Sequence, residues 1–368
     1  MKTLSYGLVG CGMMGKGHIR SLALCEDVEV AALADPHEPS LAAALEALGR
    51  EAPTFASHTE MLAKEDLDAC IIATPNHTHA DIVCEVLASG CDVLSEKPMA
   101  TTIEDANRIV EAVRESGRVY QIGLELRYEP YHQRTGDLIA AGRVGRVRQL
   151  WVKEFRGPWM RKVEDWITQK ERSGGALLEK DCHHFDLFNW FADARPVKVA
   201  GFGTVDLVYG SETFSVEPDV LDNAQVVVQY DTGAVATLML NMYCLEYLDG
   251  LELGVIGTEG YLQSSASEKS IVLARRETGE RTTIECRTPE SIRRKSHGGA
   301  VYYEHLAFAE AVRSRERPVA DELVGWWSTV VALAGERAVA EQRVVDIAEF
   351  GPPPGGSRSE GRVSTSAP

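Results

Sequence analysis

Three side chains in this sequence have the types and spacing for acid–base chemistry. The stretch Leu94-Ser95-Glu96-Lys97-Pro98 places a lysine directly after a short apolar run, where a plain surface turn would not require one. Farther along, Glu179 and His183 are four residues apart in a segment with helical apolar spacing, so we expect them to share a helix face. A histidine beside a carboxylate can be held in one tautomer and act as a general base. The plainer alternative for such a pair is a satisfied core histidine on a polar face, and His184, about 100° around the helix, is the weaker candidate.

A glycine-rich loop at the start of the chain indicates a place for a phosphate group. The apolar run Leu4 to Val9 enters Gly10-Cys11-Gly12-Met13-Met14-Gly15, and a helix follows. Glycines alone are a weak signal, but here a strand precedes them and a helix follows. Such a turn lets backbone N–H groups approach a pyrophosphate at the helix N-terminus. We therefore expect Gly10, Gly12, Met13, Met14 and Gly15 to contact a dinucleotide.

The next strand ends in an acidic residue that indicates which dinucleotide binds. Val28 to Ala34 is followed by Asp35, about 20 residues past the last glycine of the loop. A carboxylate there can accept hydrogen bonds from the adenosine ribose hydroxyls and repels a 2′-phosphate. Asp35 therefore favours NAD over NADP. The alternative is that Asp35 only forms a turn before Pro36.

Strands and helices alternate through the first 123 residues. This pattern predicts an α/β Rossmann domain with a doubly wound parallel sheet, whose ligands bind at the carboxyl ends of its strands. Gly10, Asp35, Thr74, Glu96 and Gln121 all fall near those predicted ends. Thr101 or Thr102 is expected to cap a helix that runs to about Ser116.

His77 and His79 lie in the loop after the strand that ends near Thr74. They raise the possibility of a metal site, but zinc needs three or four converging ligands and no partner stands at a recognisable spacing. We predict no metal, and we favour loop capping or cofactor contact for these residues.

From Glu125 onward the composition shifts. A helix over Tyr131 to Ala141 and a strand over Val147 to Phe155 are followed by an irregular stretch, residues 156 to 175, of the kind that is more often functional than idle. After the helix that carries His183 the chain is rich in strands, which predicts an α+β domain with a large, mostly antiparallel open sheet. The expected domains are 1–123, 124–350 and a disordered tail, 351–368, rich in Pro, Gly and Ser.

Composition excludes several classes of protein. The chain has 368 residues, 44% hydrophobic and 25% charged, and a net charge of −17, which argues against a nucleic-acid surface. No apolar run approaches the roughly 20 residues of a membrane helix, and the N-terminus offers no cleavable signal. Eight cysteines without a CxxC pair indicate a reducing compartment, so we expect a cytoplasmic protein. These cysteines are Cys11, Cys25, Cys70, Cys84, Cys91, Cys182, Cys244 and Cys286.

In combination, these motifs resemble the Gfo/Idh/MocA family, the relatives of glucose-fructose oxidoreductase and inositol dehydrogenase, over roughly Leu4 to Ile347. The resemblance implies that Lys97 reaches the nicotinamide ribose and the substrate hydroxyl, and that His183 is the catalytic histidine. Glu179 stands where many members carry Asp, and Lys180 where many carry a neutral residue. The matching pieces are Gly10 to Gly15, Ala73-Thr74-Pro75-Asn76 with His79, Glu96-Lys97-Pro98, Leu126-Arg127-Tyr128-Glu129-Pro130 and Gly174 to Asp186.

The resemblance implies an NAD-dependent dehydrogenase that oxidises a secondary hydroxyl of a sugar or an inositol-like cyclitol. His183 would accept the hydroxyl proton, Lys97 would stabilise the developing alkoxide, and Glu179 would orient His183 or bind a neighbouring hydroxyl. A homo-oligomer, dimer or tetramer, is also expected. The candidate substrate residues are Arg127, Tyr128, Trp159, Trp166 and Lys180, and the candidate cofactor residues include Thr74, Asn76, His79, Glu96, Lys97 and Gln121.

Two alternatives share these residues. An NAD-dependent glycosidase or epimerase would oxidise its substrate transiently and return the hydride, so that only product analysis separates it from a dehydrogenase. A non-catalytic NAD-binding regulator would have no need of a general base, and the presence of Lys97, Glu179 and His183 together counts against it.

Overall fold

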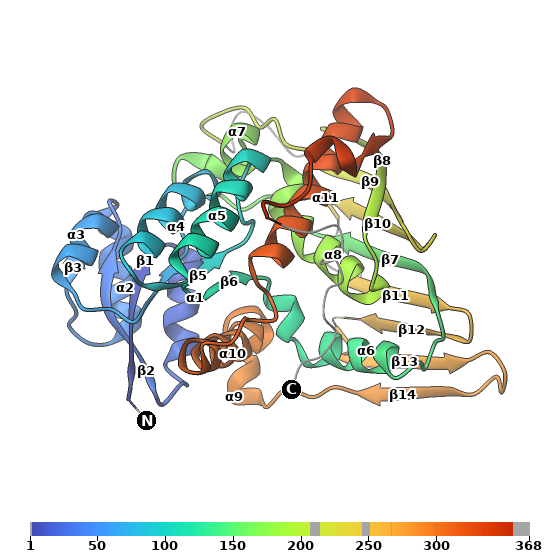
Figure 1. Ribbon diagram of the computed structural model, residues 1–368, viewed down its shortest axis with the longest axis horizontal. Helices are drawn as coiled ribbons and strands as arrows, with labels where there is room; N and C mark the ends of the chain where they lie inside the picture. Colours follow the sequence, from blue (N-terminus) through green and yellow to red (C-terminus); the bar gives the residue numbers. More distant parts are fainter. Residues whose placement is uncertain (1, 207–213, 245–250, 266, 356–368) are drawn as a thin grey trace. The chain divides into compact units, whose positions relative to one another are not determined.

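A computed structural model describes residues 2–206, 214–244, 251–265 and 267–355 (Figure 1). The chain divides into two compact units by its contacts. The first unit combines Met1–Glu129 with Thr288–Trp326, and the second combines Pro130–Arg287 with Trp327–Pro368.

The first unit contains a six-stranded sheet in the order β3-β2-β1-β4-β5-β6. Every neighbouring pair of strands is parallel, which confirms the predicted doubly wound sheet. All residues of β4, β5 and β6 are buried, as parallel strands covered on both faces require. The strands are β1 (Leu4–Val9), β2 (Val28–Ala34), β3 (Thr54–Phe55), β4 (Ala69–Ile72), β5 (Asp92–Glu96) and β6 (Tyr120–Gly123).

The helices of this unit follow the strands in the expected alternation. Thr102 caps α5, since its side chain accepts a hydrogen bond from the backbone N–H of Asp105 at 3.1 Å, and Gly117 ends the helix in the left-handed conformation. In Figure 1, α4 and α5 lie side by side. The helices are α1 (Met13–Leu22), α2 (Glu38–Leu48), α3 (His58–Lys64), α4 (His79–Ala88) and α5 (Ile103–Ser116), with short 3-10 helices at Asn76–Thr78 and Glu125–Tyr128.

A helix from the far end of the sequence completes the core of the first unit. Phe308 of α10 (Ala300–Ser314) is fully buried among side chains of β1 and α1, with its ring centroid 5.6 Å from that of Tyr6. This differs from the expected boundary, which placed all of 124–350 in a second domain. The apolar side of α10 matches the sheet of the first unit, and this long-range match has no local sequence signal. The adjoining elements are α9 (Glu290–Arg293), a 3-10 helix at Ser296–Gly299, and α11 (Glu322–Glu341), which the division between the units crosses.

The second unit contains a nine-stranded sheet in the order β14-β13-β12-β11-β7-β10-β9-β8-β15. Its pairs are antiparallel except β7 with β10, so the prediction of a mostly antiparallel sheet is confirmed. The strands are β7 (Val147–Phe155), β8 (Pro196–Thr204), β9 (Asn223–Tyr230), β10 (Val235–Asn241), β11 (Leu251–Gly257), β12 (Gly260–Ser265), β13 (Ser270–Arg275), β14 (Arg281–Glu285) and β15 (Val345–Asp346).

One face of this sheet is covered and the other is open. Alternate residues of β9 and β10, such as Val226 and Leu238, are fully buried, whereas their neighbours Val227 and Met239 face outward. Helix α8 (Ala176–Ala192) packs against β7. The unit also contains α6 (Pro130–Ala140), α7 (Lys170–Ser173), the part of α11 that begins at Trp327, and a short 3-10 helix at Ile347–Phe350.

The stretch expected to be irregular, residues 156 to 175, carries a 3-10 helix at Val163–Thr168 as well as α7. Of the expected disordered tail, residues 356–368 lie outside the described part of the chain. Within the described ranges, none of the helices is long and apolar enough to cross a membrane.

Candidate active site

The loop between β1 and α1 has the geometry of an anion-binding turn. Gly10 adopts a positive φ of 93°, and a Cβ there would stand 2.5 Å from the backbone of Ala73. A Cβ on Gly15 would collide with the carbonyl oxygen of Gly10. Gly12 is different, because a Cβ there would have no neighbour within 4 Å and its φ is −70°. Two glycines therefore serve the turn itself, and Gly12 leaves open space at the N-terminus of α1.

The first turn of α1 contains no acidic side chain of its own, so none of its residues opposes the positive end of the helix dipole at this space. Met13 is 49% exposed and Met14 is half-buried, so both flank the open side of the turn. A pyrophosphate fits this donor set, which consists of backbone N–H groups and a helix N-terminus.

Asp35 follows the end of β2 and ties the glycine loop to the next turn. Its Oδ2 accepts a hydrogen bond from the backbone N–H of Cys11 at 2.7 Å, and its Oδ1 accepts one from the N–H of His37 at 2.8 Å. Each carboxylate oxygen can accept a second bond, so the half-buried group retains capacity for ribose hydroxyls.

The loop after β4 is braced by His79. Its Nδ1 lies 2.8 Å from the carbonyl oxygen of Pro98, and its Nε2 lies 3.0 Å from that of Thr74. Burial lowers the pKa of His79, although the two carbonyls oppose that effect. The ring thus links the loop after β4 to the loop after β5. Thr74 and Asn76 stand in the braced loop, and their contact with a cofactor stays a prediction.

The ends of β5 and β6 carry Glu96, Lys97 and Gln121. Glu96 Oε2 accepts a hydrogen bond from the backbone N–H of Lys97 at 3.2 Å, and the Lys97–Pro98 peptide bond is cis. Lys97 is half-buried. Gln121 is fully buried and donates from Nε2 to the carbonyl oxygen of Glu304 at 3.2 Å. These positions confirm that the strand ends gather here, as parallel topology requires.

Sequence reasoning missed four buried ionisable groups beside these strand ends. His18 lies 2.9 Å from Glu96 and 3.0 Å from His305, and two further carboxyl groups, Glu125 and Glu304, are buried nearby. His18 follows the glycine loop by three residues, which could have drawn attention to it. His305 and Glu304 lie almost three hundred residues later and gave no such signal.

Arg127 and Tyr128 are more deeply buried than substrate contacts would suggest. Arg127 is 2% exposed. Burial raises the pKa of Asp321, and the charge of Arg127 is one of the contributions that oppose this rise. This favours a supporting role for Arg127 beneath the loop.

In the second unit, α8 holds Glu179, Lys180 and His183, as the predicted helix requires. Lys180 Nζ lies 3.0 Å from Glu179 Oε2 and 4.6 Å from the ring centroid of Trp159. The lysine is thus clamped between a carboxylate and an aromatic face, a contact that the sequence did not predict. His183 is 8% exposed, Trp159 is buried and Trp166 is half-buried.

The neighbouring His184 is held away from this group. Its Nδ1 lies 2.9 Å from Asp181 Oδ1, and its Nε2 lies 3.8 Å from Glu154 Oε2. Burial opposes ionisation of His184, but the two carboxylates outweigh it and raise its pKa. Burial also raises the pKa of Asp181 to about 6. His184 is therefore engaged in a buried charge network with Asp181 and Glu154.

The predicted catalytic residues are distributed over both units, with Lys97 in the first and Glu179 and His183 in the second. Among the residues that the structure describes, no group of three or more His, Cys, Asp or Glu side chains is placed to hold a metal ion.

Comparisons with known proteins agree with this geometry. Residues 4–124 match a family described as oxidoreductases with an NAD-binding Rossmann fold, and residues 132–263 match the GFO/IDH/MocA C-terminal domain. The inositol 2-dehydrogenase of Salmonella typhimurium is 30% identical over 262 residues, which are 70% of this chain and 73% of that protein. The rhizopine catabolism protein MocA of Rhizobium meliloti is 31% identical over 196 residues, 53% of this chain but only 59% of that protein.

Solved structures share the fold. A levoglucosan dehydrogenase in complex with NADH and L-sorbose aligns with a TM-score of 0.84 at 20% identity, covering 94% of this chain and 99% of that one. At this identity the likeness concerns the arrangement of the two sheets and their helices.

Proposed function

Because the chain belongs to the GFO/IDH/MocA family of oxidoreductases, we propose that it oxidises a secondary hydroxyl of a sugar or cyclitol to a ketone, with NAD⁺ as the hydride acceptor. The observation that carries the proposal is Lys97, a half-buried cation whose backbone N–H is bound by Glu96 at the carboxyl edge of the Rossmann sheet. Ligands of such sheets bind at this edge.

The residues present fit NAD. The turn Gly10 to Gly15 would hold the pyrophosphate, and Asp35 would accept hydrogen bonds from the adenosine ribose. Thr74, Asn76, His79, Glu96 and Gln121 line or brace the remaining strand ends. When bound, NAD⁺ supplies a hydride acceptor. Asp35 favours NAD over NADP because a second negative charge, the 2′-phosphate, would face its carboxylate.

His183 would accept the proton of the substrate hydroxyl, since a neutral imidazole is the side chain best suited to proton transfer near pH 7. The Lys97 ammonium would hold the same oxygen and stabilise its negative charge as the proton leaves. Glu179 would orient His183 or bind a neighbouring hydroxyl. Its ion pair with Lys180 fixes the carboxylate in place.

Substrate selection is proposed to lie mainly in the second unit. The clamp of Lys180 between Glu179 and Trp159 presents a fixed cation beside His183 on the same helix. Trp166 could stack on the apolar face of a sugar ring. The burial of Arg127 and Tyr128 favours a role in supporting the substrate site from behind.

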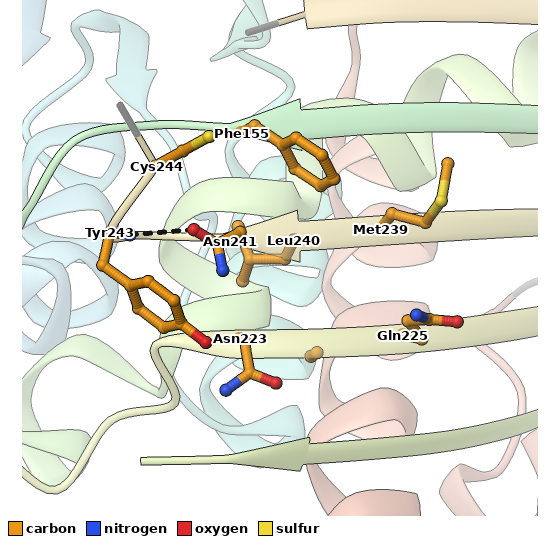
Figure 2. A pocket seen from close by; sticks show the side chains of 9 residues that line it. Phe155, Asn223, Gln225, Met239, Leu240, Asn241, Tyr243 and Cys244 are labelled. Carbon is orange, nitrogen blue, oxygen red and sulfur yellow. Dashed lines mark hydrogen bonds between the residues drawn. The ribbon is translucent and has the colours of Figure 1, made fainter. Parts of the chain in front are cut away.

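We also propose that the open face of the second sheet meets a second copy of the chain, giving a dimer or tetramer. Phe202 and Val227 on this face are 79% and 40% exposed. Figure 2 shows the neighbouring groove, where Phe155, Met239, Asn223 and Gln225 stand on adjacent strands. A mixed apolar and amide surface of this kind is typical of subunit contacts. Light scattering coupled to gel filtration tests this, and Phe202→Asp should yield a smaller species.

A cytoplasmic location is part of the proposal. All eight cysteines are free thiols, and five of them lie within the first unit. Free buried thiols suit a reducing compartment.

A substrate screen tests the activity. The purified protein is incubated with NAD⁺ and a panel of inositols, pyranoses and anhydrosugars, and NADH absorbance and products are both recorded. Formation of NADH with a ketone product is expected for at least one polyol, and Lys97→Ala and His183→Ala should each abolish it. Sugar turnover without net NADH would instead identify transient oxidation, as in a glycosidase or epimerase. NAD binding without turnover of any panel member would favour a regulator.

A further inference from the structure

Three side chains from distant parts of the sequence form a continuous buried chain that ends at Lys97. His18 comes from α1, Glu96 from the end of β5 and His305 from α10. His18 Nδ1 lies 3.0 Å from His305 Nε2, and His18 Nε2 lies 2.9 Å from Glu96 Oε1. His18 and His305 are completely buried and Glu96 is 5% exposed, so water does not compete for these bonds.

The chemistry of the groups assigns a direction to the hydrogen bonds at Glu96. A carboxylate only accepts hydrogen bonds, so His18 donates from Nε2 to Glu96. Burial and the charge of His18 hold the pKa of His305 well below its usual range, so His305 is neutral. The bond between His18 Nδ1 and His305 Nε2 has one donor and one acceptor, which the tautomers of the two rings set. At the other end, Glu96 Oε2 accepts from the backbone N–H of Lys97 at 3.2 Å.

Glu96 is the charged member of a crowded group of carboxyls. Burial, followed by the charge of Glu96, raises the pKa of Glu125 to about 8 and raises that of Glu304 well above its usual range. Glu304 is completely buried, and neither carboxyl oxygen has a hydrogen-bond partner among the described residues. Burial therefore disfavours the charged form of both groups. Burial opposes the ionisation of Glu96 too, but the bond from His18 and the charges of His18, Lys97 and His297 outweigh it and lower its pKa.

We propose that His18 and His305 are positioning residues that hold the Glu96 carboxylate against Lys97, and so set the placement and charge of the lysine ammonium in the active site. The proposal rests on the function proposed above, in which Lys97 contacts the substrate oxygen. It assigns a role to α10, a helix that lies outside both matched family regions.

The expected effect follows from electrostatics. Without His18, Glu96 would lose the hydrogen bond and the charge that contribute most to offsetting its burial, and it would take up a proton more readily. Lys97 would then lose the negative charge with which it interacts, and a nearby opposite charge typically moves a pKa by about 1–3 pH units. The ammonium of Lys97 should therefore titrate at lower pH.

Two variants separate positioning from mere packing. His18→Phe keeps an aromatic ring but cannot bond to Glu96, whereas the side-chain amide of His18→Gln can still donate to it. A matched control is His58→Gln, because His58 Nε2 lies 2.7 Å from Glu85 Oε2 in an ordinary surface pair of the same unit. NAD affinity is measured for these three variants and should stay within about threefold of the wild type.

The direct readout is the titration of Lys97 itself, which needs no substrate. Lysines are dimethylated with a ¹³C label and followed by NMR against pH, and the Lys97 resonance is the one missing from Lys97→Arg. In His18→Phe its midpoint should fall by about one pH unit or more, while His18→Gln and His58→Gln should leave it near the wild-type value. The pH profile of kcat should shift in the same direction.

An unchanged Lys97 midpoint in folded His18→Phe would overturn the proposal. If His18→Phe does not fold, Glu96→Gln takes its place in the test, because it removes the charge of Glu96 at nearly constant shape. The Lys97 midpoint must then fall by about one pH unit or more. An active Lys97→Ala enzyme would refute the proposed function instead, and the NMR titration would still report on the link between His18 and Lys97.

Discussion

Gly15 lies so close to Gly10 that a methyl group on Gly15 would overlap the Gly10 carbonyl oxygen. Gly12, two residues into the same loop, has open space where its side chain would be. The two substitutions should therefore fail for different reasons. Gly15→Ala must displace backbone and should lower the free energy of unfolding by roughly 1–3 kcal/mol.

Gly12→Ala should leave stability nearly unchanged, since its φ of −70° suits alanine. Its methyl group would occupy the place proposed for the pyrophosphate, and NAD affinity should fall at least tenfold. Denaturant unfolding and calorimetric titration with NAD measure the two effects separately. A Gly12→Ala protein that binds NAD normally would place the cofactor elsewhere.

Asp35 bonds to the backbone of both Cys11 and His37, so its carboxylate is fixed before any cofactor arrives. Asp35→Asn should weaken NAD binding by about 10–100-fold, because a hydrogen bond to a charged group contributes about 1.5–3 kcal/mol. NADP binding should weaken less, since the repulsion of the 2′-phosphate is also removed.

The matched control is Asp68→Asn, because Asp68 also accepts a backbone hydrogen bond, from Ser5 at 2.9 Å, but at the opposite end of β1. Titration of each variant with NAD and NADP should show changed cofactor affinities for Asp35→Asn and unchanged affinities for Asp68→Asn. Equal losses for both cofactors in Asp35→Asn would refute the assignment of preference to this carboxylate.

The pair of Glu179 and Lys180 offers a thermodynamic test. Their side chains are 8% and 15% exposed, so removal of one charge leaves the other largely buried without its ion-pair partner. Lys180→Met should cost roughly 1.5–3 kcal/mol of unfolding free energy. The double variant Lys180→Met/Glu179→Gln should recover most of it. Strictly additive losses in the cycle would show that the two residues do not stabilise each other.

Local patterns predicted most of the fold. The glycine loop and the Thr102 cap have short-range signatures, and each is found where expected. The small elements β3 and α3 were missed, although Ser57 and Glu60 carried a usable cap signal, since the Ser57 side chain accepts from the Glu60 N–H. A two-residue edge strand has too few residues to show a period.

The part of the site that sequence could not predict is the part that long-range burial creates. His18 and His305 are 287 residues apart, and nothing in either segment indicates that their rings meet. In the same way, the contact of Lys180 with Trp159 depends on how residues 156–175 fold back on α8. Motifs identify single residues, whereas partners from distant segments emerge only when the core is assembled.

Glu125 should control the pH dependence of stability. Burial and the charge of Glu96 raise its pKa to about 8 in the folded protein, whereas an exposed glutamate titrates near pH ~4.3. Below the pKa of the unfolded chain, Glu125 is protonated in both states, and its contribution to the free energy of unfolding is fully present. As the pH rises toward 8, the unfolded chain ionises first, so stability is lost across this window.

Glu125→Gln imitates the neutral acid and removes this loss. Each pH unit in the window corresponds to about 1.4 kcal/mol, so the variant should gain on the order of 2–4 kcal/mol over the wild type between pH 5 and pH 8. Urea unfolding at several pH values measures the difference, with the exposed Glu111→Gln as control. Stability curves that run parallel for Glu125→Gln and the wild type would show that Glu125 is ionised in the folded protein. In that case Glu125 and Glu96 would both be charged in the folded protein.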